Sequence, residues 1–482
     1  MAKRLVGHLT SDPHHCLGML IGGMTGILFL CSMTRHWLFH SGGYDLGIFD
    51  QAVYLLSQGE RPFSTIRGIH ILGDHAAIIL YPISFLYQIW PSVTWLLGLQ
   101  SLALASGGWL TYQVAKQAGL PDQTSLIMAI VYLAYPAVFN INLFDFHPEV
   151  MAVPALLGAV WAIRAGSILR FLICVIWLLS CKAVLALTVI ALGLWIVVWE
   201  TPRLSETVRV KMQMAGWLAI GLGCLWFVLT TFWLIPTFSG EAPAAVSSYA
   251  YLGESVPEIA FNLILKPHLV LGKILSLETL GYLLLLTIPI LWGLSWRYWD
   301  PVVPALPSLG LNILSNHSDY RDLVHHYSLS IIPFLMVMVI DNLSSQRIWN
   351  RSRKLITIWT LISFLALAKY GYFGSLYLTH LNSWSATRTA LQRVDPLGGV
   401  LTTHEISPHL THRPMIVFTD QEIPVQDWDP FEFVLLNRSN PGWRSSPEYV
   451  ETLLADIAAS ELFTPLFEQD QVTLFHKINP KE

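Results

Sequence analysis

Residues 183–199, AVLALTVIALGLWIVVW, form an apolar run without a single charged side chain. A transmembrane helix needs about 20 such residues, or somewhat fewer where the segment is buried inside a bundle. Ten further, predominantly apolar runs occur along the chain, at 16–37, 93–115, 123–139, 150–165, 168–181, 213–235, 277–296, 300–314, 324–345 and 355–373. The sequence therefore predicts a mainly α-helical, polytopic membrane bundle of about 11 transmembrane helices.

The composition supports the same fold class. Of the 482 residues, 54% are hydrophobic and only 12% are charged, and the mean hydropathy is +0.52. Soluble domains carry roughly 25% charged residues, so a soluble globular protein, a disordered chain and a coiled coil are excluded. Apolar runs of this length also exclude an outer-membrane barrel. The net charge of −4 gives no indication of a nucleic-acid partner, and the five cysteines form no CxxC pair that would predict a zinc site.

The basic residues predict the orientation of the bundle. With a cytoplasmic N-terminus, 13 Lys and Arg residues lie in inner loops, among them Lys3, Arg4 and the group Arg347–Lys354, against 7 in the outer loops before residue 369. Eleven crossings then place the C-terminus outside. The first run has no A-x-A-like site after it, so we expect a retained helix and not a cleaved signal. The short, proline-broken segment 76–90 is expected to lie at the membrane surface or to re-enter.

A change of composition after residue 373 predicts two domains, a transmembrane domain at 1–373 and an extracytoplasmic α/β domain at 374–482. Short strands are expected at 398–403, 414–418, 431–437 and 471–477, with helices at 405–411 and 447–461. This second domain holds no phosphate loop, no G-x-S-x-G elbow and no metal-ligand spacing. A lid or a docking module is the simplest interpretation.

The first outer loop, 38–92, is expected to carry surface helices and contains two acidic motifs. Asp45 follows Gly42-Gly43 and either caps a helix that runs to about Ser57 or carries chemistry. Asp50 lies about 140° around that helix from Asp45, so helix geometry alone does not bring the two carboxylates to one point; it lies on a solvated face or in an active site. Asp74 and His75 close the loop.

Further ionisable residues gather in the later outer loops. Asp145, His147 and Glu149 stand at the start of a predicted transmembrane helix, where they form either a capping cluster or a base with a cation site. Lys182 stands alone between two apolar runs, as a snorkelling lysine or as a cation that faces a phosphate. A last group comprises Arg321, His325, His326 and Tyr327. It is either an anion site at headgroup depth or an ordinary interfacial cluster.

Several strings carry a resemblance to a known family. They are YDLGIFDQ (44–51), Gly73-Asp74-His75, Phe146-His147-Pro148-Glu149, His326-Tyr327 with Pro333-Phe334, and PHLTHR (408–413). Together they resemble a bacterial family of predicted integral membrane proteins that looks like a branch of the GT-C glycosyltransferase superfamily. The resemblance implies a multi-pass protein of the inner membrane and a sugar donor linked to polyprenyl phosphate. It also implies that an acidic residue just after the first helix lies at the reaction centre.

That implied acidic residue matches Asp45 first and Asp50 second, and the acidic residue of the second outer loop matches Asp145 or Glu149. The sequence departs from the family pattern after the lysine, where Ala183-Val184 replaces two acidic residues. Lys182 therefore has no carboxylate neighbour in the sequence.

These observations predict a membrane glycosyltransferase that moves a sugar from a polyprenyl-phosphate donor to an acceptor hydroxyl on the outer face. Asp45 is the predicted base, with His147 or Glu149 assisting, and Lys182, Arg321 and His326 are predicted to hold the phosphate. The other candidates for substrate binding are Asp74, His75, His325 and Tyr327. Neither HExxH nor an EF-hand loop is present, so no cofactor is assigned and a divalent cation is left open. Two alternatives stay open, a lipid or solute transporter or flippase, and a catalytically degenerate assembly protein.

Overall fold

The computed structural model describes residues 12–346, 348 and 351–478. Lys3, Arg4 and Arg347, on which part of the predicted orientation depends, lie outside these residues. The chain divides into two compact units. Among these described residues, the helical unit comprises those of 12–30, 72–79 and 98–369, and the mixed unit comprises 31–71, 80–97 and 370–478.

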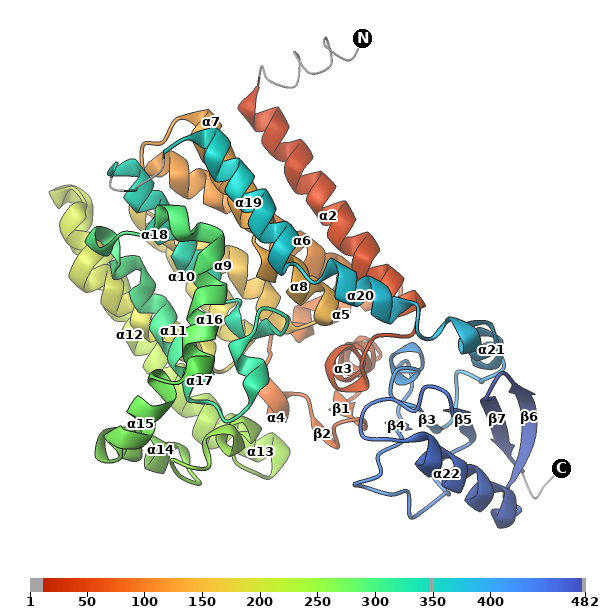
Figure 1. The fold of residues 1–482 in the computed structure, drawn as a ribbon. Coiled ribbons are helices and arrows are strands. Elements are labelled where there is room, and N and C mark those ends of the chain that lie inside the picture. Colours follow the sequence, from red (N-terminus) through yellow and green to blue (C-terminus); the bar gives the residue numbers. More distant parts are fainter. Residues whose placement is uncertain (1–11, 347, 349–350, 479–482) are drawn as a thin grey trace, which may run out of the picture. The chain divides into compact units, whose positions relative to one another are not determined.

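The long helices of the helical unit run side by side (Figure 1). Its helices are α4 (Leu72–His75), α6 (Thr94–Gln117, largely in this unit), α7 (Asp122–Leu133), α8 (Pro136–Phe144), α9 (Ala152–Arg164), α10 (Ile168–Cys181), α11 (Leu185–Trp195), α12 (Glu206–Leu229), α13 (Ile235–Ser239), α14 (Val256–Leu265), α15 (Pro267–Ile274), α16 (Leu277–Thr287), α17 (Leu306–Leu314), α18 (Ile332–Ser344) and α19 (Arg353–Leu367). The first part of α2 (Pro13–Trp37) also belongs to it.

Five helical segments among the described residues are long and apolar enough to cross a membrane: Pro13–Trp37, Asp122–Phe144, Leu185–Arg203, Glu206–Ser239 and Arg353–Tyr377. A sixth is added if Pro267–Ile274 and Leu277–Gly293, which are bent by 50°, count as one span. Each of the eleven predicted runs contains helix, and several of these helices are short or broken. The number of crossings therefore stays a prediction.

The run at 324–345 differs from the expectation. Its helix, α18, begins only at Ile332, because Pro333 occupies the first turn, where a missing N–H costs nothing. The preceding residues form a separate turn, η11 (His326–Ser328). In the same way, η2 (Pro148–Met151) precedes α9. Both turns carry candidate site residues. Because these residues precede the α-helices, their side chains do not follow the spacing of the helical repeat.

Glycines allow α11 and α12 to cross at close range. A Cβ at Gly193 of α11 would lie 2.5 Å from the carbonyl oxygen of Gly216 of α12, and a Cβ at Gly223 would lie 2.9 Å from that of Ala186. Only residues without a side chain allow two backbones to approach so closely, which is the usual packing device of helices inside a bilayer. Substitution of either glycine would force α11 and α12 apart.

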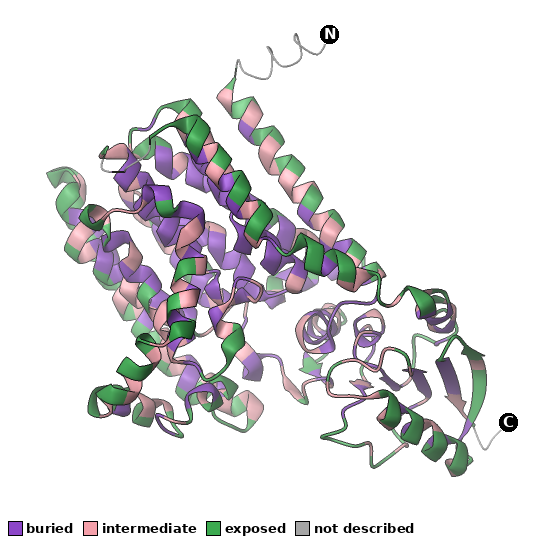
Figure 2. Ribbon diagram, viewed as in Figure 1, coloured by how far each residue is buried: buried purple, intermediate pink, exposed green. Residues whose placement is uncertain are grey.

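The outward faces of the peripheral helices are apolar. Large side chains such as Leu30 of α2, Leu225 of α12 and Leu365 of α19 are each more than 60% exposed. Figure 2 shows these helices in the colours of exposed and intermediate residues, whereas α8 and α9 are almost wholly buried. Apolar faces of this extent are not tolerated in water, so they are the faces that lipid covers.

A buried network of charges connects the helix ends near the predicted inner face. Arg164 of α9 donates to Glu200 at 2.7 Å and forms a two-pronged pair with Asp341 of α18 at 2.9 and 2.7 Å. Arg203 forms a similar pair with Asp300 at 2.9 and 2.8 Å. Bidentate pairs of this kind are the strong form of ion pair. The network therefore holds α9, α18 and the segment after α11 in a fixed arrangement.

The mixed unit contains a five-stranded sheet in the order β4-β3-β5-β7-β6. Its strands are β3 (Val400–Thr402), β4 (Ile416–Phe418), β5 (Phe433–Asn437), β6 (Phe463–Gln469) and β7 (Val472–Lys477). β3 pairs in parallel with β4 and β5, whereas β7 pairs antiparallel with β5 and β6. α22 (Pro447–Ser460) buries Val450, Leu453 and Ile457 in one core with Leu401 and Val434. The sequence analysis missed β6, an edge strand with Pro465 in its middle.

The first outer loop clusters with this sheet and not with the helical unit. It supplies η1 (Gly43–Gly47), α3 (Ile48–Ser57), the hairpin β1 (Phe63–Ser64) and β2 (Ile69–His70), and α5 (Leu80–Ile89), while α20 (Tyr370–Tyr377) and α21 (Leu381–Leu391) lead into the sheet. The helix ends at Ser57 as predicted, but it begins at Gly43 with Gly42 as its N-cap. Asp45 is therefore not the cap. The predicted helix at 405–411 is only the short turn η12 (Ser407–His409).

Candidate functional site

Three ionisable side chains meet inside the helical unit. Lys182 Nζ lies 2.6 Å from Glu149 Oε1 and 3.4 Å from His326 Nε2, and His326 Nε2 lies 3.1 Å from the same Glu149 oxygen. Glu149 belongs to η2, Lys182 follows the last residue of α10, and His326 opens η11. All three side chains are at most 13% exposed. We call this group the Glu149 cluster.

The charges of the Glu149 cluster favour an ionised carboxylate. Burial by itself raises the pKa of the Glu149 carboxyl, but the ammonium of Lys182 and the neighbouring imidazoles His147 and His75 outweigh burial and lower the pKa to about 2. The sequence offered Lys182 no adjacent carboxylate. Its partner comes from a loop 33 residues away, so Lys182 is a buried, paired cation and not a snorkelling one.

Two acceptor atoms of the cluster have no hydrogen-bond partner within the described part of the chain. They are Glu149 Oε2 and His326 Nδ1, and both are buried. An imidazole Nε2 that donates to Glu149 leaves Nδ1 with a lone pair, whereas the other tautomer would leave a buried N–H unpaired, which costs more. We therefore assign the Nε2–H tautomer to His326. The cluster then presents two unfilled acceptors beside one cation.

The remaining residues of the second outer loop support this cluster. The His147 ring stacks on His326 with centroids 3.8 Å apart, and its Nδ1 lies 3.3 Å from the carbonyl oxygen of Asp145. The backbone N–H of His147 donates to Gln100 Oε1 at 3.2 Å. The Asp145 carboxylate is itself buried and accepts from the N–H of Phe146 at 3.2 Å. His147 and Asp145 thus position His326, which is a less direct role than the predicted assistance in proton transfer.

His75 belongs to the same surroundings. Its carbonyl oxygen accepts from the N–H of Ala183 at 2.9 Å, which ties α4 to the residue after Lys182. Its ring nitrogen Nε2 lies 3.3 Å from Asp74 Oδ2. Burial lowers the pKa of the His75 imidazole, although the charges of Asp74 and Glu149 act in the opposite direction. The structure therefore brings Asp74 and His75 together with Lys182, as three of the candidates for substrate binding.

His325 and Tyr327 flank His326 in sequence but are held by other groups. His325 Nδ1 lies 2.7 Å from Asp322 Oδ2, and the ring contacts Phe144 edge-on at 4.4 Å. Tyr327 stacks on Tyr320 with centroids 3.7 Å apart and lies 4.1 Å from the His326 ring. These contacts fix the turn that presents His326.

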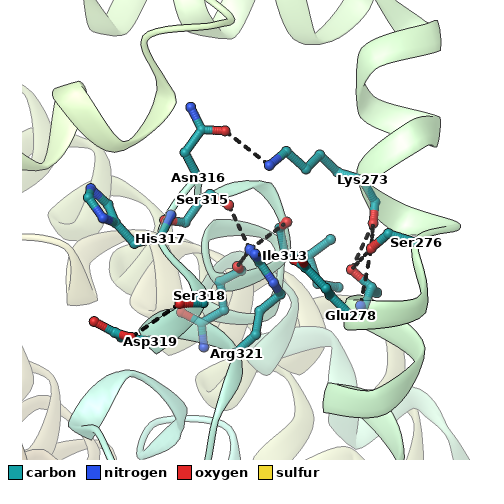
Figure 3. A network of polar contacts seen from close by, with 12 residues as sticks. Lys273, Ser276, Glu278, Ile313, Ser315, Asn316, His317, Ser318, Asp319 and Arg321 are labelled. Atoms are coloured by element: carbon teal, nitrogen blue, oxygen red, sulfur yellow. Dashed lines mark hydrogen bonds and ion pairs between the residues drawn. The ribbon is translucent and has the colours of Figure 1, made fainter.

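Arg321 lies at the C-terminal end of α17. Its guanidinium donates to the carbonyl oxygens of Asn312 and Ser315 at 3.3 and 2.6 Å, and forms an ion pair with Glu278 at 2.7 Å. Figure 3 shows the Arg321 side chain beside Ile313 and Ser315, at the end of α17, whereas Lys273 in the same network donates to Asn316 at 3.0 Å. The last carbonyls of a helix lack partners of their own and favour a cation. This contact set describes a helix cap.

Asp45 lies in the mixed unit, in the first turn of η1, and is half-buried. A Cβ at Gly42 would lie 3.1 Å from His404 Cε1 and 3.5 Å from Asp45 Oδ2, so both side chains border Gly42. The N–H of Gly43 donates to His404 Nε2 at 3.2 Å. A Cβ at Gly43 would lie 2.6 Å from Ser407 Oγ, which explains the requirement for glycine at the start of this motif.

Asp50, also in the mixed unit, is 1% exposed, so the interpretation as a solvated carboxylate is wrong. Its carboxylate accepts from Tyr87 at 2.5 Å and from Thr411, and lies 3.1 Å from His412 Nε2. Burial raises the pKa of the Asp50 carboxyl, but His412 and the hydrogen bonds outweigh it and hold the pKa below its usual range. The same pair raises the pKa of His412, against the effect of burial.

The sequence analysis did not select Tyr87, Thr411 or His412 as site residues. Thr411 and His412 lie in the string PHLTHR, which was already noted for its resemblance to a family pattern. What could not be read from the sequence is that this string contacts a helix 361 residues earlier. Among the described residues, no group of three or more His, Cys, Asp and Glu side chains is arranged to hold a metal ion.

Comparisons with known proteins give one family. The family model described as "Predicted membrane protein (DUF2079)" matches residues 35–474. No curated protein sequence matches the chain. Among solved structures, ArnT from Cupriavidus metallidurans bound to undecaprenyl phosphate is similar with a TM-score of 0.48 and 11% identity, over 96% of this chain and 98% of that chain. The same ArnT in the apo state has a TM-score of 0.44 and 12% identity, over 94% of this chain and 97% of that chain.

Proposed function

The chain belongs to the DUF2079 family of predicted membrane proteins, and from that premise we propose that it is an integral-membrane glycosyltransferase. It moves a sugar from a polyprenyl-phosphate donor to an acceptor hydroxyl on the outer face of the membrane, with the N-terminus in the cytoplasm and the C-terminal domain outside. The substrate class follows from the motif resemblance described above. The observation that carries the proposal is the Glu149 cluster, a buried cation with two unfilled acceptors at the ends of apolar helices.

Lys182 is the group that holds the donor phosphate. Its ammonium has three N–H donors, and contacts to Glu149 and His326 account for at most two of them. A charge buried among apolar helices is costly and is retained where it serves a function. During transfer the polyprenyl phosphate leaves with an additional negative charge, and a fixed cation next to that oxygen stabilises the transition state.

The two acceptor atoms of the Glu149 cluster can accept hydrogen bonds from sugar hydroxyls. Glu149 Oε2 and His326 Nδ1 are buried without a hydrogen-bond donor among the described residues, and each such atom costs about 1–3 kcal/mol. Sugar hydroxyls are donors of the right kind, and their binding would recover that cost. Glu149, with its low pKa, remains a hydrogen-bond acceptor at neutral pH and does not take up the proton of the reaction.

Asp45 is the base. Asp50 is less suited to this role, because its carboxylate already accepts from Tyr87 and Thr411 and is paired with His412. Asp45 is less buried and occupies the position that the family resemblance implies. In the reaction the acceptor oxygen forms a bond to the anomeric carbon while the bond from that carbon to the phosphate oxygen breaks. The bonding electron pair stays on the phosphate, and the hydroxyl proton passes to Asp45.

The proposal is tested by sugar transfer in proteoliposomes that contain the full-length protein and a panel of labelled polyprenyl-phosphate sugars. The wild type is expected to transfer at least one of these sugars. Asp45→Asn should slow transfer by about 10²–10⁴-fold, the usual contribution of a general base. Asp122→Asn is the matched control, because this exposed carboxylate pairs with Lys116 away from the cluster, and it should retain full activity.

Full transfer by Asp45→Asn would reject the assignment of the base. A wild-type protein that transfers no sugar from any member of the panel would reject the transferase itself. If such a protein instead moved the labelled lipid from one leaflet to the other, the transporter alternative would replace it.

A further inference from the structure

The mixed unit contains a cavity of about 380 Å³ that the proposed reaction does not use. The ionisable side chains of its lining are His36, Asp50, His409, His412 and Arg413, and the rest of the lining includes Pro91, Leu391 and Val394. We call it the Arg413 cavity. A volume near 380 Å³ lies at the lower end of the range of small-molecule pockets, roughly 300–1,000 Å³, and the wall combines polar and apolar side chains in similar measure.

The charges of the Arg413 cavity do not cancel. Asp50 and His412 form an ion pair at 3.1 Å and neutralise each other. Arg413 is 4% exposed, and its guanidinium donates to the carbonyl oxygens of Leu410 and Gly398 at 2.8 and 3.2 Å. It forms no ion pair with any carboxylate in the described part of the chain. Burial lowers the pKa of Arg413, and the carboxylates of Asp395 and Glu432, which lie beyond ion-pair distance, offset burial only in part. The positive charge of the cavity is therefore incompletely matched, which favours an anion beside the guanidinium.

The cavity also offers an acceptor for a hydroxyl group. The His409 ring stacks on His36 with centroids 3.9 Å apart, and a hydrogen bond joins it to the backbone of His36. Its buried Nε2 has no partner among the described residues, so that bond belongs to Nδ1. Nδ1 is therefore the donor and Nε2 carries a lone pair. Burial lowers the pKa of His409 to about 3, which keeps the ring neutral and the lone pair available at pH 7.

We propose that the Arg413 cavity binds a small hydroxylated organic anion of about monosaccharide size, a sugar acid or a sugar phosphate. Arg413 pairs with the carboxylate or phosphate, His409 Nε2 accepts from a hydroxyl, and the proline and aliphatic side chains contact the C–H faces of the ring. The inference stands on the geometry of the mixed unit alone. It does not depend on the proposed transfer reaction.

The test is isothermal titration calorimetry on the full-length protein in detergent micelles, with four probes: glucuronate, glucose 6-phosphate, glucose and inorganic phosphate. Glucuronate or glucose 6-phosphate is expected to bind at one site per chain. Glucose, which lacks the charge, and phosphate, which lacks the ring, should each bind at least about tenfold more weakly, since a hydrogen bond to a charged group corresponds to roughly a tenfold to hundredfold change in affinity.

Arg413→Gln should weaken binding of the organic anion by the same factor, whereas Arg444→Gln should change it less than twofold. Arg444 is the matched control, because it is a partly exposed arginine of the same unit that already pairs with Asp420. His409→Phe keeps the stacked ring, removes Nε2 and should weaken binding severalfold.

Arg413 also holds two backbone carbonyls, so Arg413→Gln can fail to fold. Val394→Trp then decides the question, because it fills the cavity and leaves the contacts of Arg413 in place; it should abolish binding. Equal affinity of the wild type and Val394→Trp would overturn the proposal, as would equal binding of glucose and glucuronate, or a wild type that binds neither organic anion. A wild-type protein that binds glucuronate but transfers no sugar would reject the proposed transferase function and would still support an anion site in the Arg413 cavity.

Discussion

Replacement of Lys182 by methionine tests the Glu149 cluster most sharply. The variant keeps a long unbranched side chain but removes the ammonium that lies 2.6 Å from Glu149 Oε1. The Glu149 side chain is 9% exposed, so water cannot replace the lost partner without a structural change. In the wild type, folding lowers the pKa of this carboxyl from 4.5 to about 2. At about 1.4 kcal/mol per pH unit, this difference corresponds to about 3 kcal/mol of stability at neutral pH.

Lys182→Met should therefore lose about 3–5 kcal/mol of unfolding free energy at pH 7, the cost of leaving one partner of a buried ion pair alone. The pH dependence should also reverse. In the wild type, the contribution of Glu149 is present above pH 4.5 and is lost as the pH falls toward 2. In Lys182→Met, burial is no longer opposed by the ammonium, the pKa of Glu149 rises above 4.5, and stability falls as the pH rises through that value.

The assay is denaturant unfolding of the purified protein in detergent micelles, followed by tryptophan fluorescence between pH 4 and pH 8. Glu149→Gln and the double variant complete a double-mutant cycle. Because the double variant leaves no unpaired charge, it should be more stable than Lys182→Met, with a coupling energy of at least about 2 kcal/mol. Additive single effects, with a coupling energy below about 0.5 kcal/mol, would refute the reasoning.

Three further predictions concern stability. His412→Phe should lower the unfolding free energy by about 1.5 kcal/mol below pH 6.5, where the imidazolium of the wild type hydrogen-bonds to Asp50. Because folding raises the pKa of His412, this loss should shrink as the pH rises through the raised pKa. A difference in melting temperature that stays constant from pH 5 to pH 9 would contradict the prediction. Arg321→Met should lower the unfolding free energy by about 2–3 kcal/mol, because it leaves carbonyl oxygens at the end of α17 unpaired. Glu278→Gln changes a side chain that is 70% exposed and should lower it by less than about 1 kcal/mol. Equal losses in denaturant unfolding would reject the helix cap. Arg164→Met should cost about 3–5 kcal/mol by leaving buried acids unpaired, and a thermal melt within 2 °C of the wild type would reject the network.

The membrane fold could be predicted because its signal is local. Each apolar run is read from consecutive residues, and all eleven runs contain helix. Helix starts were predicted less well, because α9 begins only after the turn η2, which Pro148 opens, and α18 begins only at Ile332, with Pro333 in its first turn. In the C-terminal domain, four strands and α22 were predicted from short hydrophobic stretches, whereas β6 was missed because its side chains are mostly exposed and proline is rare inside strands. The match to DUF2079 confirms the family that the motifs indicated.

The site was predicted as a set of residues but not as a set of pairs. Glu149, Lys182 and His326 were all selected, yet their contacts span up to 177 residues of sequence and depend on where α10 ends and on where the turns η2 and η11 lie. The missing carboxylate after Lys182 is explained by Glu149, which no local pattern reveals. The partner of Asp50 lies even farther away, in the string PHLTHR. Ionisable residues in outer loops are visible in sequence, whereas the pairs that they form are products of packing.

The affinity of the full-length protein in lipid nanodiscs for a polyprenyl phosphate tests the central claim most directly, because the Glu149 cluster is proposed to hold that phosphate. The account predicts saturable binding to the wild type and binding at least about tenfold weaker to Lys182→Met, since a charge-assisted hydrogen bond is lost. Lys116→Met, which removes an exposed lysine paired with Asp122, should bind as the wild type does. Equal affinities of the wild type and a folded Lys182→Met would contradict the account.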